Sequence, residues 1–146
     1  MFRGNYPTRV DEKGRLKVPS EFKRLIDEKY GAQFYITSLD GKAALLYPFE
    51  EWQRIEERLA RLSNFNPTKK KFLTRTNYYG QMVEMDAQGR LLIPALLRQA
   101  AQIRGEVAVL GNLTFVEVRN EESLRKDVTE PFTAEDEKTL DELLGT

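Results

Sequence analysis

The sequence contains no cysteine and no histidine. Disulfide bonds, thiolate metal sites and thiol nucleophiles are therefore excluded, as are Ser-His-Asp triads and zinc sites built on histidine. Carboxylate and lysine chemistry stays open, but the chain shows no paired-carboxylate motif, no P-loop and no Gly-x-Gly-x-x-Gly. We therefore expect a protein that is not an enzyme and that uses no cofactor, no metal and no small-molecule substrate.

Long apolar runs are missing as well. No stretch approaches the ~20 apolar residues that a membrane-spanning helix needs. The opening residues, from Met1 to Pro7, lack the apolar core of a signal peptide. We therefore expect a cytoplasmic protein with no membrane partner.

Net charge is absent too, because 23 basic residues balance 23 acidic ones. The neutral total hides an uneven distribution. Residues 117–146 hold ten acids and four bases, a net charge of −6, which leaves +6 on residues 1–116. The first thirty residues alone hold eight bases against five acids. A basic body with an acidic tail is compatible with a local phosphate-binding face.

The chain contains an internal repeat with an offset of 75 residues. Residues 11–19 read DEKGRLKVP and residues 86–94 read DAQGRLLIP, so that Asp, Gly, Arg, Leu and Pro are identical. After each proline the sequence predicts, in the same order, a short helix, a glycine, two strands and an acidic helix start. This ordered parallel indicates a duplicated unit.

The repeated motif predicts a tight β-hairpin. An aspartate before a turn can accept backbone N–H bonds. Gly14 and Gly89 stand where a three-residue hairpin loop needs a left-handed residue. Pro19 and Pro94 end the second strand and favour a helix start.

The segments outside the motif predict further elements. Trp52, Ile55, Leu59 and Leu62 have helical spacing. Asn66 and Pro67 favour the start of a helix from Thr68 to about Asn77, followed by a strand from Tyr78 to Met85. Near the end, Thr133 and Asp136 form a capping-box pattern. We expect a first unit at 1–52, a helical spacer at 53–76, a second unit at 77–122 and an acidic helical segment at 123–146.

Neither unit alone can bury a full core, because each has only about four short strands and one helix. Pairing of the two copies about a pseudo-twofold axis solves this problem, since each hairpin then completes the other copy's barrel. We therefore predict an α+β fold with a β-barrel core and flanking helices.

The combination of motifs resembles the MraZ family of bacterial proteins, which carry tandem AbrB-like (SpoVT-AbrB) domains. The resemblance rests on the paired D-x-x-G-R-L-x-[VI]-P motifs, the opening MFRG, the LYP before the Trp52 helix, and Asn66-Pro67. It implies swapped-hairpin units, a ring-shaped homo-oligomer of roughly eight to twelve chains, and a nucleoid-associated transcriptional regulator. Such a regulator binds double-stranded DNA at direct repeats in the promoter of the division and cell-wall gene cluster.

Two interpretations compete for the motif residues. In the first, Arg15 binds a phosphate or a guanine of DNA. In the second, each arginine forms a structural salt bridge with an aspartate, within its copy or across the pseudo-twofold axis. The first copy has lysines around its turn where the second copy has uncharged residues. We therefore predict that the first copy reads DNA and that the second is its structural partner. The predicted DNA-binding residues are Arg3, Lys13, Gly14, Arg15 and Lys17, and the predicted structural residues are Asp11, Asp86, Gly89 and Arg90.

Three features leave alternatives open. Lys69, Lys70 and Lys71 form either a solvated helix face or a functional basic cluster. The aromatic residues Trp52, Phe65, Phe72, Tyr78 and Tyr79 are expected in the core or in a subunit interface rather than stacked on bases. The acidic C-terminal segment also allows a different function, in which the chain is an AbrB-like antitoxin or another protein-binding module.

Overall fold

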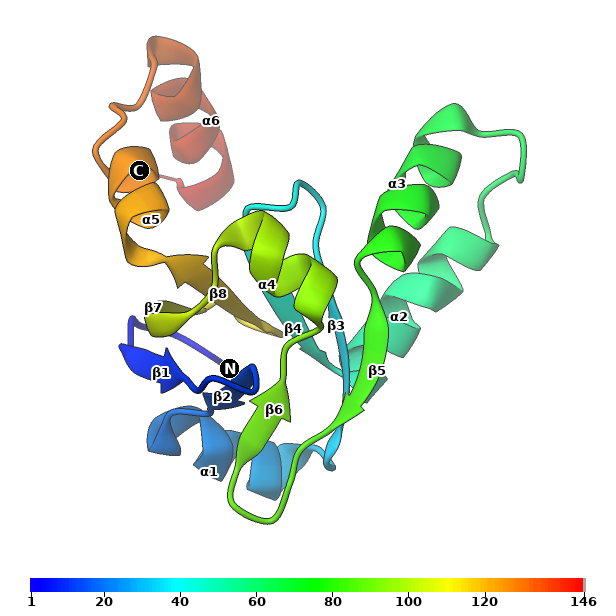
Figure 1. Cartoon of the computed structure of the whole chain (residues 1–146). Helices are drawn as coiled ribbons and strands as arrows, with labels where there is room; N and C mark the ends of the chain where they lie inside the picture. Colours follow the sequence, from blue (N-terminus) through cyan, green and yellow to red (C-terminus); the bar gives the residue numbers. More distant parts are fainter. Residues whose placement is uncertain (146) are drawn as a thin grey trace.

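The computed structural model describes residues 1–145 and shows an α+β fold (Figure 1). The strands are β1 Thr8–Val10, β2 Arg15–Lys17, β3 Gln33–Thr37, β4 Ala43–Pro48, β5 Gln81–Glu84, β6 Arg90–Leu92, β7 Gly105–Gly111 and β8 Val116–Asn120. The helices are α1 Ser20–Lys29, α2 Phe49–Ala60, α3 Pro67–Tyr78, α4 Ala95–Ala101, α5 Glu121–Val128 and α6 Ala134–Leu144.

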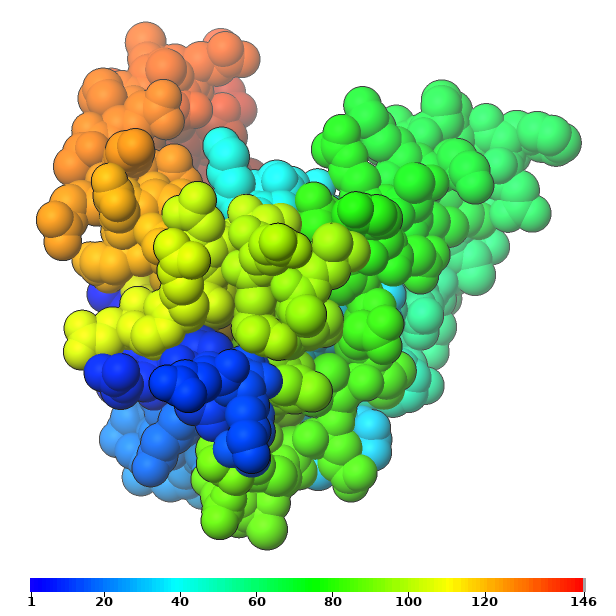
Figure 2. Space-filling model, viewed as in Figure 1, coloured from blue at the N-terminus to red at the C-terminus, as the bar shows by residue number. Residues whose placement is uncertain are grey.

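The strands form one antiparallel sheet in the order β5-β3-β4-β8-β7-β1-β2-β6. The two copies exchange their hairpins in this sheet. First-copy β1 pairs with second-copy β7, whereas second-copy β5 pairs with first-copy β3. The outermost strands, β5 and β6, are the two arms of the second-copy hairpin, so the sheet curls into a nearly closed barrel. In Figure 2 the blue first-copy hairpin lies against yellow-green second-copy residues.

Two hydrogen bonds display the pseudo-twofold symmetry directly. The backbone N–H of Val18 donates to the Gly89 carbonyl at 3.0 Å, and the N–H of Ile93 donates to the Gly14 carbonyl at 2.9 Å. These four residues are related by the offset of 75. Each hairpin turn is therefore bonded to the strand end of the other copy, which confirms the predicted swap.

The barrel interior contains equivalent residues from both copies. Leu16 and Leu91 are fully buried, and Val18 and Ile93 follow them in the same cluster. Burying one such side chain is worth ~1.5–3 kcal/mol. Because the pairs come from separate copies, neither copy has this core without the other.

A helical hairpin, α2 and α3, projects from the barrel (Figure 1). Trp52 anchors it by stacking on Tyr35, with ring centroids 4.7 Å apart. Asn66 caps α3 by accepting the N–H groups of Thr68 and Lys69, as predicted. The capping box of Thr133 and Asp136 at the start of α6 is confirmed as well.

Some expected boundaries differ from the structure. The strand expected from Tyr78 begins at Gln81, because α3 continues through Tyr78 and the chain turns at Tyr79 and Gly80. Phe65 is 95% exposed and Tyr78 is 62% exposed, so both lie outside the core of the chain. The boundaries expected after residues 52, 76 and 122 fall inside α2, α3 and α5.

The acidic C-terminal segment is attached to the barrel through Arg119 at the end of β8. Arg119 is buried, and its guanidinium donates to the Asp127 carboxylate of α5 at 2.5 Å. Beyond this ion pair, α6 extends away from the sheet (Figure 1) and has no buried residue. Within residues 1–145, no helix combines the length and apolarity needed to cross a membrane.

Candidate nucleic-acid interface

The first-copy turn is organised by Asp11. Its Oδ1 accepts the backbone N–H groups of Lys13 at 3.0 Å and Arg15 at 2.9 Å. Its Oδ2 accepts the Arg15 Nε–H at 3.0 Å. The carboxylate therefore fixes the turn and the direction of the Arg15 side chain together.

The second-copy turn repeats this arrangement. Asp86 accepts the backbone N–H groups of Gln88 and Arg90 at 2.9 Å each, and its Oδ2 accepts the Arg90 Nε–H at 3.0 Å. The main ion pairs thus lie within each copy. A longer contact of 4.0 Å, from Arg90 Nη1 to Asp11 Oδ2, joins the two copies.

These hydrogen bonds lower the pKa of both aspartates. For Asp11 the largest cause is the backbone N–H of Arg15, and for Asp86 it is the backbone N–H of Arg90. Each arginine side chain lowers the pKa further. Both carboxylates are consequently ionised at neutral pH and keep the two arginines in place.

The glycines of the two turns are buried and adopt left-handed backbone. Gly14 has φ +88° and Gly89 has φ +75°. A Cβ at Gly14 would lie 2.3 Å from the guanidinium of Arg98, a second-copy residue whose Nε–H donates to the Ile93 carbonyl at 2.8 Å. Gly14 is thus covered by Arg98, and its position suits a residue that shapes the turn rather than one that touches a ligand.

Sequence reasoning missed Arg98, although the repeat holds a signal for it. The offset of 75 relates Arg98 to Lys23, and the Lys23 side chain lies over Gly89 in the same way. The two bases differ in their surroundings. Lys23 Nζ pairs with Asp27 at 2.7 Å, but the residue equivalent to Asp27 is the uncharged Gln102. The region around the first-copy turn is therefore the more basic of the two.

The outward face of β2 and β6 joins both copies into one surface. Arg15 stands opposite Leu92, and Lys17 stands opposite Arg90. Leu16 and Leu91, which lie between these two pairs, point into the barrel. The side chains of the two pairs therefore share the outer face. The charge of Arg90 is offset by its ion pair with Asp86, whereas Lys17 is exposed. We call the surface formed by Lys13, Arg15, Lys17, Arg90 and Leu92 the basic face.

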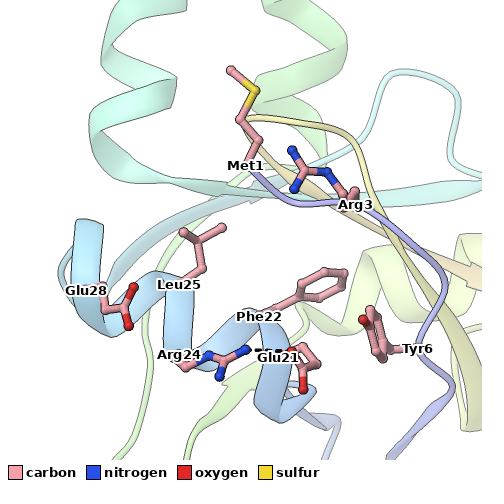
Figure 3. Close-up of a pocket in the computed structure, with 8 residues that line it drawn as sticks. All are labelled: Met1, Arg3, Tyr6, Glu21, Phe22, Arg24, Leu25 and Glu28. Carbon is pink, nitrogen blue, oxygen red and sulfur yellow. Dashed lines mark hydrogen bonds and ion pairs between the residues drawn. The ribbon is translucent and has the colours of Figure 1, made fainter.

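Arg3 lies apart from the basic face. The N-terminal strand pairs with β7 in one register from Phe2↔Leu113 to Val10↔Gly105. Arg3 is seven residues from Val10, so at ~3.3 Å per residue it lies at most about 23 Å from the start of the turn. Figure 3 shows Arg3 beside α1, lining a cavity of about 440 Å³ with Phe22 and Arg24. One chain therefore does not join Arg3 to the other predicted DNA-binding residues in a single patch.

The three consecutive lysines of α3 do not act alike. Lys69 is buried, and its Nζ donates to the Leu62 carbonyl and to Asn64 Oδ1, both at 3.0 Å. This lysine closes the loop between α2 and α3. Lys70 and Lys71 are exposed, which matches a solvated helix face.

No cluster of metal-ligating side chains occurs in the part of the chain that the structure describes, residues 1–145. The candidate site is thus a surface of guanidinium, ammonium and one apolar side chain. Such a surface can bind phosphates through charge and base edges through directed hydrogen bonds.

Known proteins are similar to this chain over most of its length. The family model described as "MraZ protein, putative antitoxin-like" matches residues 1–75 and 80–143. A protein of Koribacter versatilis named Transcriptional regulator MraZ is 61% identical over 145 residues, covering 98% of this chain and 99% of that protein. Proteins of the same name are 60% identical in Acidobacterium capsulatum (97% and 98% covered) and 35% identical in Serratia proteamaculans (92% and 90% covered). The chain therefore belongs to the MraZ family.

Proposed function

We propose that this protein is a transcriptional regulator that binds double-stranded DNA in a sequence-specific manner through the basic face. The observation that carries the proposal is Arg15, an arginine oriented by Asp11 on an exposed basic face. The names of the relatives support the regulatory role. The target expected from the family resemblance is the promoter of the division and cell-wall gene cluster.

Arg15 is prepared for recognition by its fixed geometry. Asp11 holds the Nε–H at 3.0 Å, and 32% of the Arg15 side chain remains exposed. No described residue accepts a hydrogen bond from the two terminal nitrogens, so they are available to a guanine edge or a phosphate. Because the side chain is already oriented, binding costs less conformational entropy.

The neighbouring bases add affinity rather than specificity. Lys13 at the turn and Lys17 on β2 are exposed and unpaired, which suits contacts with phosphates. Gly14 enters the proposal as the residue that gives the turn its shape. Arg3, which lines the cavity at α1 and is outside the basic face, would reach a separate stretch of the DNA backbone.

One basic face of this size binds DNA weakly, so we propose that several chains act together. A ring of identical chains, as the family resemblance implies, would place one basic face on each of several direct repeats. Repeats about one helical turn apart, ~34 Å, would present the same side of the duplex to every chain. Linked weak contacts then multiply into useful affinity.

The test is a binding assay on the DNA upstream of the protein's own gene, with Arg15→Ala compared with wild type. Arg61→Ala is the matched control, because Arg61 is an exposed arginine on the helical hairpin. We expect Arg15→Ala to nearly abolish binding while keeping the melting temperature and the mass in solution, and Arg61→Ala to bind as wild type. Wild-type affinity should fall steeply with salt. A flat salt response, or an Arg15→Ala variant that binds normally, would exclude the proposal.

A second candidate function is that of an antitoxin-like or other partner-binding module, as the family description suggests. The exposed leucines of α6, Leu143 at 75% and Leu144 at 68%, favour it, since they give the acidic segment an apolar edge. Two repeat copies in one chain weigh against it, because such antitoxins usually carry a single copy. A toxin encoded beside this gene and co-purifying in fixed ratio would favour the second candidate.

A further inference from the structure

Leu92 is an exposed leucine on the basic face, on the outermost strand β6. Its exposed fraction is 48%, and its backbone is paired directly with Arg15 across β2 and β6. The repeat offset relates Leu92 to Lys17, so the two copies place an apolar and a basic side chain at equivalent positions. An exposed leucine contributes little to the core, which Leu91 already fills from the opposite face of the same strand.

The chemistry beside Leu92 indicates what it could contact. Directly opposite residues on a sheet face have Cβ atoms about 4.5–5.5 Å apart, whereas stacked base pairs are about 3.4 Å apart. A duplex held by Arg15 would therefore bring Leu92 within one or two base pairs of the base that Arg15 contacts. The apolar group that the major groove displays is the 5-methyl group of thymine.

We propose that Leu92 packs on the 5-methyl group of a thymine one or two base pairs from the base contacted by Arg15, and thereby determines part of the operator sequence. This inference rests on the proposed function, because it requires that the basic face meets the major groove. It makes the recognition surface a composite of both copies. The first copy supplies the hydrogen-bonding arginine, and the second copy supplies the methyl-reading leucine.

The experiment removes the methyl group from the DNA and the leucine from the protein. Thymines in the bound upstream DNA are replaced one at a time by deoxyuridine, which lacks only the methyl group. Affinities are measured for wild type, Leu92→Ser and the control Leu96→Ser, whose leucine is 43% exposed on α4. Each variant is first checked for melting temperature and mass in solution.

We expect wild type to bind about fourfold more weakly when one particular thymine is replaced, the loss that corresponds to one buried methyl group. Leu92→Ser should bind the thymine and deoxyuridine sites equally well, and Leu96→Ser should discriminate as wild type does. A Leu92→Ser variant that still discriminates, or a wild type indifferent to every replacement, overturns the inference while leaving the proposed function intact. A Leu92→Ser variant that changes mass in solution but still discriminates thymine from deoxyuridine also overturns the inference, because Leu92 then lies in the interface between chains. Failure of wild type to bind the unmodified DNA overturns the proposed function as well.

Discussion

Replacement of Gly14 by alanine tests how the two copies are joined at the first-copy turn. The φ of +88° costs an L-residue ~1–2 kcal/mol. The new Cβ would also displace the Arg98 guanidinium and break its bond to the Ile93 carbonyl, a loss of about 1 kcal/mol. The reduced entropy of the unfolded chain returns about 0.5 kcal/mol. The free energy of unfolding should therefore fall by about 2 kcal/mol.

The matched control is Gly89→Ala in the second-copy turn. Its φ of +75° carries a similar conformational cost. The neighbouring atoms, however, are Cδ and Cε of Lys23 at 2.9 Å, and this flexible side chain can move aside without losing a backbone contact. We therefore expect Gly89→Ala to cost only about 1 kcal/mol.

Thermal or urea unfolding at one fixed protein concentration would measure both changes. At about 2–4 °C per kcal/mol for a chain of this length, Gly14→Ala should lower the melting temperature by about 4–8 °C. In an Arg98→Ala background the cost of Gly14→Ala should shrink to that of Gly89→Ala. Equal costs for the two glycines in wild type would refute the role given to Arg98.

Two further predictions concern charged groups. Folding lowers the pKa of Asp11 and Asp86 below the ordinary 3.8, so their ionised forms stabilise the fold above that pH, and this stability is lost as the pH falls below it. When unfolding is followed against pH, the free energy of unfolding should fall less steeply in acid for Asp11→Asn than for wild type. An unchanged slope would contradict this prediction. Lys69→Met should lower the free energy of unfolding by about 1 kcal/mol, because loss of Nζ leaves the Leu62 carbonyl and Asn64 Oδ1 without their donor. Lys70→Met should be neutral in the same melting assay. Equal effects of the two variants would show that the Lys69 hydrogen bonds contribute nothing.

Local chemistry explains which parts of the fold could be predicted from the sequence. The hairpin turns, the Asn66 cap and the Thr133 capping box depend on residues within a few positions of each other, so their patterns are visible in the sequence. The swap could be predicted only because the duplication supplies two similar hairpins in one chain. The start of β5 differs from the prediction because α3 continues through Tyr78, although Gly80 directly before β5 is a sequence signal for the break.

In the candidate site, too, contacts between residues close in sequence could be predicted, and contacts between distant residues could not. Pairing of Arg15 with Asp11 follows from their spacing of four residues and the turn between them. The cover of Arg98 over Gly14 and the position of Leu92 opposite Arg15 depend on strands from different copies. The family resemblance points to Arg3, but its side chain lines the cavity at α1 and not the basic face.

The two copies differ in a way that separates folding from recognition. The residues that bend the turn and fill the barrel are identical or similar in both copies, such as Asp11 and Asp86 or Leu16 and Leu91. The copies differ in the core as well, where Ile26 is matched by Ala101, and on the outer face, where Lys17 is matched by Leu92. A duplicated fold needs its core twice, but a DNA duplex read across the pseudo-twofold axis presents different base edges to the two halves. Under the proposed function, the exchange of Lys17 for Leu92 gives the two halves of the basic face different chemistry, which suits an asymmetric operator half-site.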